Sequence, residues 1–354
     1  MPSRTDAPGR SGRRVVGWDV GGAHLKACLL EDGAVRDVAQ WPCPLWQGLQ
    51  WLDAALAAAR ERWPAAWDAD TAHRATMTAE MVDVFPTREE GVVRLAVHLA
   101  EALGPALRLY SLDGFVEPPA ARAHWKEIAS ANWHASARLV APRVVDGLLL
   151  DIGSTTTDVI ACVGGRVKAR GLDDAHRLAT GELVYHGVVR TPLCALAPRV
   201  VLDGRIVNVM NEFFATTADV YRLTGELDAA HDQATPADGG ERSVAASRRR
   251  IARMVGRDAR DLPDAQWLEL AQDWRRAQCE EIEGQVLRVA SAAGLAADAP
   301  LVGAGCGAFL AASIAFRGGR PFRRLADVVP AARGAAWAEV CAPAVAVALL
   351  DGED

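Results

Sequence analysis

Two stretches of this chain carry the same pattern: VVGWDVGGAHLKACLLEDGAV at residues 15–35 and LLLDIGSTTTDVIACVGGRV at residues 148–167. Each is an apolar strand, an Asp-x-Gly turn, a small or polar run, a second apolar strand and a Gly turn. Two matched hairpins predict two similar half-sites on two lobes that face one ligand, which we expect to be phosphorylated. At a constant offset of 132 residues, the pairs are Asp19 with Asp151, Gly21 with Gly153, Gly33 with Gly165 and Val35 with Val167.

The chemistry of the turns favours a phosphate ligand. Glycine allows the backbone to approach a ligand closely, and exposed N–H groups in such turns form a concavity that binds anions. Asp19 and Asp151 would repel phosphate unless Mg²⁺ lies between, held by one or two carboxylates and water. The alternative is an ordinary pair of β-hairpins with polar turns. Hydroxyl donors at the second turn are Ser154, Thr155, Thr156 and Thr157.

Composition sets the class of protein. The 354 residues are 50% hydrophobic and 24% charged, which is typical of a globular chain of two domains. The net charge of −6 argues against a nucleic-acid-binding protein, because such proteins usually carry an excess of basic residues. No apolar run reaches the roughly 18 residues of a membrane helix. The seven cysteines are widely spaced without a CxxC pair, which is typical of reduced cytoplasmic thiols. The sequence allows a homo-oligomer but does not specify one.

The expected organisation is a mixed α/β fold of two lobes. Residues 1–13 lack the apolar segment of a signal peptide and read as a disordered tail. The first lobe is expected over 14–145 with a C-terminal helix at 335–350, and the second over 146–334.

Local patterns predict the individual elements. Thr87 is expected to cap the helix at 87–104, with Glu90 completing a capping box. A third Gly-rich turn is expected at 303–307, between a strand and a helix, where a helix N-terminus can face a phosphate or ribose. Strands are expected at 14–20 and 25–31, a short strand running into a polar turn at 75–85, and a strand and turn at 107–116. Helices are expected at 48–63, 120–133, 207–225, 245–258, 264–294 and 334–350, and an exposed loop at 228–245.

These elements resemble the superfamily of acetate and sugar kinases, actin and heat-shock chaperone ATPases. Residues 19–26 resemble its first phosphate loop, 151–158 its second and 303–307 its adenosine loop. The resemblance implies an actin-like fold, with duplicated ribonuclease-H-like domains around a cleft. Within the superfamily, DIGSTTTD is similar to the hydantoinase/oxoprolinase branch.

Four further segments resemble a group linked to tetrahydromethanopterin-dependent one-carbon metabolism, the methanofuran synthases. The resemblance implies transfer of an aminomethylfuran-methyl group from its diphosphate to the phenol of a glutamyl-tyramine acceptor, or of a tyrosine-containing acceptor in methylotrophic bacteria. Both ligands are small molecules. The segments are TMTAEMVDVFPTREEGV (76–92), ASANWHASARLVA (129–141), TGELVYHGVVRTPLCALAP (180–198) and NEFFATTADVYRLTGEL (211–227).

This reaction gives the candidate residues their roles. Asp19 and Asp151 would organise Mg²⁺, and Lys26 would neutralise a phosphate unless it is a solvated lysine. Asn132 and Arg190 would orient substrate unless they make structural hydrogen bonds. The diphosphate is expected on Gly21, Gly22, Gly153, Ser154, Thr155 and Thr156. The adenosine-like loop would bind substrate through Gly303, Gly305 and Gly307.

The phenol needs a proton acceptor with a pKa tuned toward the working pH. The candidates are Glu80, Asp83, His134 and Glu182. His134 could equally be a structural histidine, and Glu80 or Asp83 could serve the helix that begins at Thr87.

A basic run on an expected helix is either a solvated face or a site for the carboxylates of the acceptor. It consists of Arg248, Arg249, Arg250 and Arg253.

Two other functions remain open. The three phosphate-type loops also suit an ATP-dependent small-molecule kinase or an oxoprolinase-like hydrolase, although the chain is short for an oxoprolinase. A nucleotide-binding regulatory protein of the actin or chaperone type is the other alternative. ATP turnover that rises with one small substrate would favour the kinase, and nucleotide binding without turnover would favour the regulator.

Overall fold

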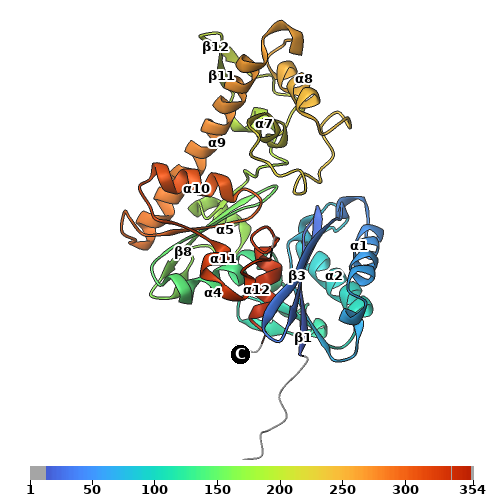
Figure 1. Cartoon of the computed structure of the whole chain (residues 1–354). Coiled ribbons are helices and arrows are strands. Elements are labelled where there is room, and N and C mark those ends of the chain that lie inside the picture. The colour runs from blue at the N-terminus through green and yellow to red at the C-terminus, as the bar shows by residue number, and fades with distance from the viewer. Residues whose placement is uncertain (1–12, 336, 352–354) are drawn as a thin grey trace, which may run out of the picture. The chain divides into compact units, whose positions relative to one another are not determined.

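The computed structural model describes residues 13–335 and 337–351. Residues 1–12 of the expected tail lie outside the described residues. The described chain forms two compact units (Figure 1). Unit 1 runs up to Leu139 and resumes at Val329, and unit 2 spans Val140–Val328. Both boundaries lie six residues before those expected from the sequence, after residues 145 and 334.

The sheet of unit 1 has the strand order β3-β2-β1-β4-β5-β6. β1 pairs antiparallel with β2 and parallel with β4, and β4 pairs parallel with β5. The strands are β1 (Arg14–Val20), β2 (His24–Glu31), β3 (Ala34–Pro42), β4 (Thr71–Met77), β5 (Leu107–Ser111) and β6 (Gly114–Val116).

The main sheet of unit 2 has the order β10-β8-β7-β13-β14, and β9 also pairs with β8. β7 pairs antiparallel with β8 and parallel with β13, and β13 pairs parallel with β14. A separate hairpin joins β11 to β12. The strands are β7 (Gly147–Ile152), β8 (Thr157–Val163), β9 (Arg166–Lys168), β10 (Leu183–Val184), β11 (Arg199–Leu202), β12 (Arg205–Asn208), β13 (Leu301–Ala304) and β14 (Phe322–Arg324).

The two sheets confirm the duplicated α/β fold expected from the sequence repeat. Each places an antiparallel hairpin beside a parallel pair of strands. In the first copy Asp19 pairs in register with Lys26, and the Asp19 Oδ2–Lys26 Nζ distance is 3.6 Å. In the second copy Asp151 pairs with Asp158, whose carboxylate instead receives the buried Arg177 guanidinium at 2.9 Å. The repeat is therefore shared in backbone but differs in the source of its positive charge.

Helices surround each sheet. In unit 2, α9 runs from the main sheet to the part that contains α7, α8 and the β11–β12 hairpin (Figure 1). The α-helices are α1 (Gln50–Arg62), α2 (Arg88–Leu103), α3 (Trp125–Ile128), α4 (Asn132–Val144), α5 (Asp174–Thr180), α6 (Leu193–Leu196), α7 (Thr217–Thr224), α8 (Val244–Met254), α9 (Asp264–Ala293), α10 (Ala308–Arg317), α11 (Leu325–Val328) and α12 (Ala342–Leu349). Short 3-10 turns are η1 (Leu45–Gln47), η2 (Pro64–Trp67), η3 (Ala79–Met81), η4 (Pro118–Ala120), η5 (Ala259–Asp261) and η6 (Pro330–Ala332).

Several local predictions are confirmed. Thr87 caps α2, and its hydroxyl accepts the Glu90 N–H at 3.2 Å. The Glu90 carboxylate pairs with Arg94 at 3.6 Å, rather than completing the expected capping box. The C-terminal helix α12 packs on β1, β2 and β4 of unit 1, as the sequence predicts. It is shorter than the expected 335–350, because residues 337–341 form turns and the helix begins at Ala342 with Pro343 in its first turn.

Three expected elements are wrong in extent. The strand expected within 75–85 begins four residues earlier, at Thr71, and ends at Met77, where the expected turn follows as η3. The helix expected at 120–133 is replaced by η4 and α3, because Ser130 takes a left-handed φ of 51° before α4 begins. The first part of the expected helix at 207–225 is the end of β12 followed by a bend at residues 211–214, and the capping box of Thr216 and Asp219 starts α7 only at Thr217.

A buried histidine makes the stability of unit 1 dependent on pH. His73 Nδ1 accepts the Trp18 Nε1–H at 3.2 Å, and burial followed by the nearby Arg74 charge lowers the pKa of His73 to about 4. In the unfolded chain the pKa of this histidine is near 6.5. The contribution of neutral His73 to the free energy of unfolding is therefore fully present above about pH 6.5 and is lost as the pH falls toward 4.

We therefore expect the free energy of unfolding to fall by about 2 kcal/mol between pH 7.5 and pH 5 through His73 alone. Urea unfolding of the wild type and of His73→Gln at both pH values measures this share, because the glutamine does not titrate. Equal pH dependence of the two proteins would contradict the assignment.

Across the described ranges 13–335 and 337–351, no helix combines the length and apolar character needed to cross a bilayer.

Candidate functional site

The second Asp-x-Gly turn is a compact, partly open loop at the end of β7. The Gly153 N–H donates to the Thr156 carbonyl at 2.8 Å and closes the turn. Asp151 is buried just before it, whereas Gly153, Ser154, Thr155 and Thr156 are half-buried. The Ser154 and Thr155 hydroxyls lie 3.4 Å apart. The turn therefore places two hydroxyls beside a buried carboxylate.

A second loop, residues 185–191, packs on this turn. The Val188 N–H donates to the Gly153 carbonyl at 3.0 Å, and the Arg190 N–H donates to the Ser154 carbonyl at 2.9 Å. The Arg190 guanidinium lies 3.4 Å from the Thr155 hydroxyl, and its partial burial lowers the pKa of Arg190. The predicted substrate residue Arg190 is thus brought to the predicted diphosphate turn.

The third Gly-rich turn meets the same place from β13. Ala304 is in register with Asp151, and the Gly307 N–H donates to the Ile152 carbonyl at 2.8 Å. Gly305 has a φ of 80°, and a Cβ there would lie 2.1 Å from the Ile152 oxygen and 2.6 Å from Asp151 Oδ1. Gly303 packs instead against the Phe322 ring. Three segments of unit 2 therefore meet beside Asp151: the turn that follows it, a loop that packs on this turn, and a glycine-rich turn that packs against its carboxylate. We call them the diphosphate turn (153–156), the clamp loop (185–191) and the glycine turn (305–307).

The first Asp-x-Gly turn in unit 1 is built in a related way. Asp19 is only 3% exposed, and Lys26 lies across the hairpin from it. The Gly21 N–H donates to the His24 carbonyl at 3.0 Å, and Gly22 follows in the same half-buried turn. The chain after β4 lies beside this turn, because the Thr78 N–H donates to the Val20 carbonyl at 3.0 Å.

Glu80 on η3 is a buried carboxyl group with two defined partners. Its Oε1 accepts the Ser130 hydroxyl at 2.8 Å and the Arg88 guanidinium at 3.1 Å. Burial raises the pKa of Glu80 against the opposing influence of Arg88. Sequence reasoning missed both partners. Ser130 lies 50 residues away, so no local signal connects it to Glu80.

The other proton-acceptor candidates lie in different settings. Asp83 is exposed after η3. His134 Nδ1 is 2.9 Å from the hydroxyl of the buried Tyr110, and the imidazole packs edge-on against Trp133, so a structural contact is present. Asn132 begins α4 and is half-buried.

Glu182 is held tightly inside unit 2. Its Oε1 accepts the Arg170 N–H at 2.7 Å, and its Oε2 accepts the Gly171 N–H at 2.8 Å and the Thr180 hydroxyl at 2.7 Å. Because both oxygens are engaged in closing local loops, geometry favours Glu182 least among the four candidates.

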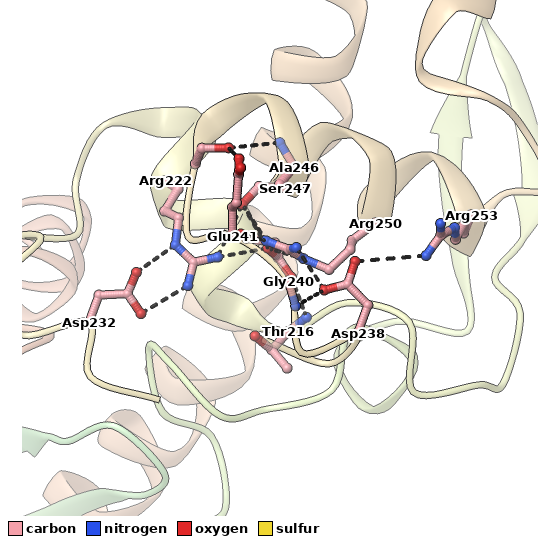
Figure 2. Close-up of polar contacts among 12 residues, drawn as sticks. Thr216, Arg222, Asp232, Asp238, Gly240, Glu241, Ala246, Ser247, Arg250 and Arg253 are labelled. Carbon is pink, nitrogen blue, oxygen red and sulfur yellow. Dashed lines mark hydrogen bonds and ion pairs between the residues drawn. The ribbon is translucent and has the colours of Figure 1, made fainter. Parts of the chain in front are cut away.

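The arginine run on α8 is neither a uniform solvated face nor an open anion site. Arg250 is fully buried and pairs with Asp219 on α7 and with Asp238 (Figure 2). Arg248 pairs with Asp264 at 2.7 Å, whereas Arg249 is exposed. Arg253 lies 3.9 Å from Asp238. The run mainly joins α8 to neighbouring segments.

Within the described part of the chain, no three His, Cys, Asp or Glu side chains are grouped to hold a metal ion.

Two curated relatives of this chain carry the same name. A synthase from Methanocaldococcus jannaschii, named (4-{4-[2-(gamma-L-glutamylamino)ethyl]phenoxymethyl}furan-2-yl)methanamine synthase, is 27% identical over 259 residues, covering 73% of this chain and 76% of that protein. The synthase of the same name from Methanococcus vannielii is 30% identical over 148 residues, covering 42% of this chain and 66% of that protein.

Solved structures show the fold. A nucleotide-free structure of acetone carboxylase aligns with a TM-score of 0.57 and 11% identity, over 95% of this chain and 70% of that one. The profile of the Hydantoinase/oxoprolinase family matches residues 71–343, which include β4, the diphosphate turn, the clamp loop and the glycine turn. The chain belongs to the hydantoinase/oxoprolinase family.

Proposed function

We propose that this protein is a biosynthetic transferase that joins an aminomethylfuran-methyl diphosphate to the phenol oxygen of a glutamyl-tyramine or glutamyl-tyrosine acceptor and releases diphosphate. The carrying observation is the convergence of the diphosphate turn, the clamp loop and the glycine turn on Asp151. Two relatives named as synthases of the matching furan ether support the choice of substrates.

The reaction breaks the bond between the furfuryl carbon and the diphosphate oxygen, and the electron pair leaves with diphosphate. The furan ring stabilises positive charge on the carbon, so the transition state is expected to be loose. Catalysis then depends on stabilising the negative charge that develops on the leaving diphosphate, and preorganised hydrogen-bond donors do this effectively. The donors of unit 2 suited to it are the Ser154 and Thr155 hydroxyls and the Arg190 guanidinium.

The site also suits Mg²⁺. This ion is usually held by one or two carboxylates together with substrate phosphates and water. Asp151 offers a buried carboxylate beside the diphosphate turn, and its Oδ1 occupies the space that a side chain at Gly305 would fill. Asp151 would hold the ion in unit 2, and Asp19 is the buried carboxylate at the matching position of the repeat in unit 1. When bound, Mg²⁺ would neutralise charge on the diphosphate.

The new bond forms between the phenol oxygen and the furfuryl carbon, and the phenol proton passes to a base. Glu80 is the first candidate, because burial raises its pKa toward the working pH.

The test is one incubation of the purified protein with Mg²⁺, the furfuryl diphosphate and each acceptor, without ATP. Mass detection of the ether with stoichiometric diphosphate is the expected result. Asp151→Asn should lose roughly 100-fold in kcat/KM. Asp203→Asn, in the exposed turn of the β11–β12 hairpin, should retain activity. No product without ATP, together with ADP formation when ATP is added, would overturn the proposal.

That result would favour the second candidate, an ATP-dependent small-molecule kinase or oxoprolinase-like hydrolase. One observation supports it: the glycine turn leads directly into the N-terminus of α10, the position expected for an adenosine loop.

A further inference from the structure

The clamp loop is fastened at Gly187 by a buried side chain from a distant helix. The Gly187 carbonyl accepts the Gln278 Nε2–H at 2.9 Å and the Thr191 hydroxyl at 3.2 Å. The Gly187 N–H donates to the Thr191 hydroxyl oxygen at 2.8 Å. Gln278 lies on α9 and is fully buried. Both polar groups of Gly187 are therefore satisfied, one of them from 91 residues away.

Gln278 is itself held in one orientation. The Tyr221 hydroxyl, from α7, donates to Gln278 Oε1 at 2.6 Å. Tyr221 is also fully buried, and burial raises its pKa, so the phenol stays neutral and remains a donor. Because the Gly187 carbonyl can only accept, the amide nitrogen of Gln278 must face Gly187 and its oxygen must face Tyr221.

The backbone of Gly187 packs directly against the backbone of the diphosphate turn. A Cβ on Gly187 would lie 2.4 Å from both the Ser154 carbonyl carbon and the Thr155 nitrogen, so the two backbones are in direct contact. The following residues Val188 and Arg190 donate their N–H groups to this turn. A shift of Gly187 therefore moves the hydroxyl and guanidinium donors together.

We propose that Gln278 is a positioning residue, which holds the clamp loop so that the diphosphate turn and Arg190 keep the geometry that binds the diphosphate substrate. Tyr221 orients Gln278 in turn. This inference takes the identity of the ligand, the furfuryl diphosphate, from the proposed function. It assigns the helical part of unit 2, through α7 and α9, a role in substrate affinity.

Gln278→Glu tests the link with an isosteric change. The ionised carboxylate of this variant still accepts from Tyr221, but it cannot donate to the Gly187 carbonyl. The protonated carboxyl group can donate again. We expect KM for the furfuryl diphosphate to rise about tenfold at pH 8 relative to the wild type, with this difference shrinking at pH 6. Because the same donors hold the departing charge in the transition state, kcat should fall together with the rise in KM.

Two further variants control the experiment. Gln272→Glu makes the same change at an exposed position of α9 and should follow the wild type at both pH values. Tyr221→Phe removes the orienting hydroxyl and should raise KM about threefold at both pH values, because the phenylalanine does not titrate. It also keeps the proposal testable if Gln278→Glu does not fold.

A readout without turnover separates this inference from the proposed function. If the wild type forms no ether, the proposed function fails, and hydrogen exchange at the Val188 and Arg190 amides then decides the role of Gln278. Faster exchange in Gln278→Glu than in Gln272→Glu at pH 8, with less difference at pH 6, supports positioning. A KM within twofold of the wild type, with unchanged exchange, would overturn it, as would an effect on KM that is the same at both pH values.

Discussion

Gly305→Ala is expected to lower kcat/KM by about 100-fold or more, because it disrupts the point where three segments meet around Asp151. The new Cβ would lie 2.1 Å from the Ile152 carbonyl oxygen and 2.6 Å from Asp151 Oδ1, and the φ of 80° adds strain. The nearer neighbour is backbone, which cannot rotate out of the way as a side chain can. The glycine turn must therefore move away from β7, and the Asp151 carboxylate must move with it.

Gly294→Ala is the control that separates the steric clash of the new Cβ from the strain of alanine at a positive φ. Gly294 ends α9 with a φ of 73°, but a Cβ there would meet nothing within 4 Å. This variant should lose about 1 kcal/mol of stability and retain activity. Steady-state kinetics and calorimetric binding of inorganic diphosphate with Mg²⁺ provide the measurement. If Gly305→Ala stays within tenfold of Gly294→Ala, the glycine turn does not shape the site.

Arg250→Ala is expected to give the largest loss of stability, about 3–5 kcal/mol, because it removes one partner of a buried ion network. The Arg250 Nε donates to Asp219 Oδ1 at 2.9 Å. Its Nη1 donates to Asp238 at 3.0 Å, as Figure 2 shows. Arg222 remains beside Asp219, but it is shared with Asp232. Two carboxylates would therefore lose part of their charge compensation, and the start of α7 would loosen with Asp219.

Arg249→Ala is the matched control, since Arg249 is the exposed neighbour on the same helix. It should change the free energy of unfolding by less than about 0.5 kcal/mol. Urea unfolding at pH 7.5 compares the two variants. A loss in Arg250→Ala that stays within about 1 kcal/mol of the control would show that the network contributes little net stability.

The backbone of this protein is readable from its sequence where the signals are local. The two Asp-x-Gly hairpins were identifiable because a strand, a turn and a second strand follow one another directly in the chain and recur at one offset. The cap of Thr87 on α2 is likewise a contact over three residues. The same locality explains why Gly305 and Gly307 could be placed at the end of β13 before a helix.

The partners of the candidate residues were not readable in this way. Arg250 looked like part of a surface run, because periodicity cannot reveal that Asp219, 31 residues earlier, lies opposite it. Gln278 gave no signal at all, since its partner is a backbone carbonyl. Ser130 ended an expected helix through a backbone conformation that its residue type does not announce.

The two copies of the hairpin also constrain how related chains can diverge. Positive charge reaches the first copy from Lys26 on its own second strand, whereas the second copy receives it from Arg177 on α5. A single Asp158→Lys replacement would set two cations against each other in a buried place, so it should be eliminated by selection unless position 177 changes first. Homologues with lysine at position 158 are therefore expected to carry an uncharged residue at position 177, so the two positions should vary together.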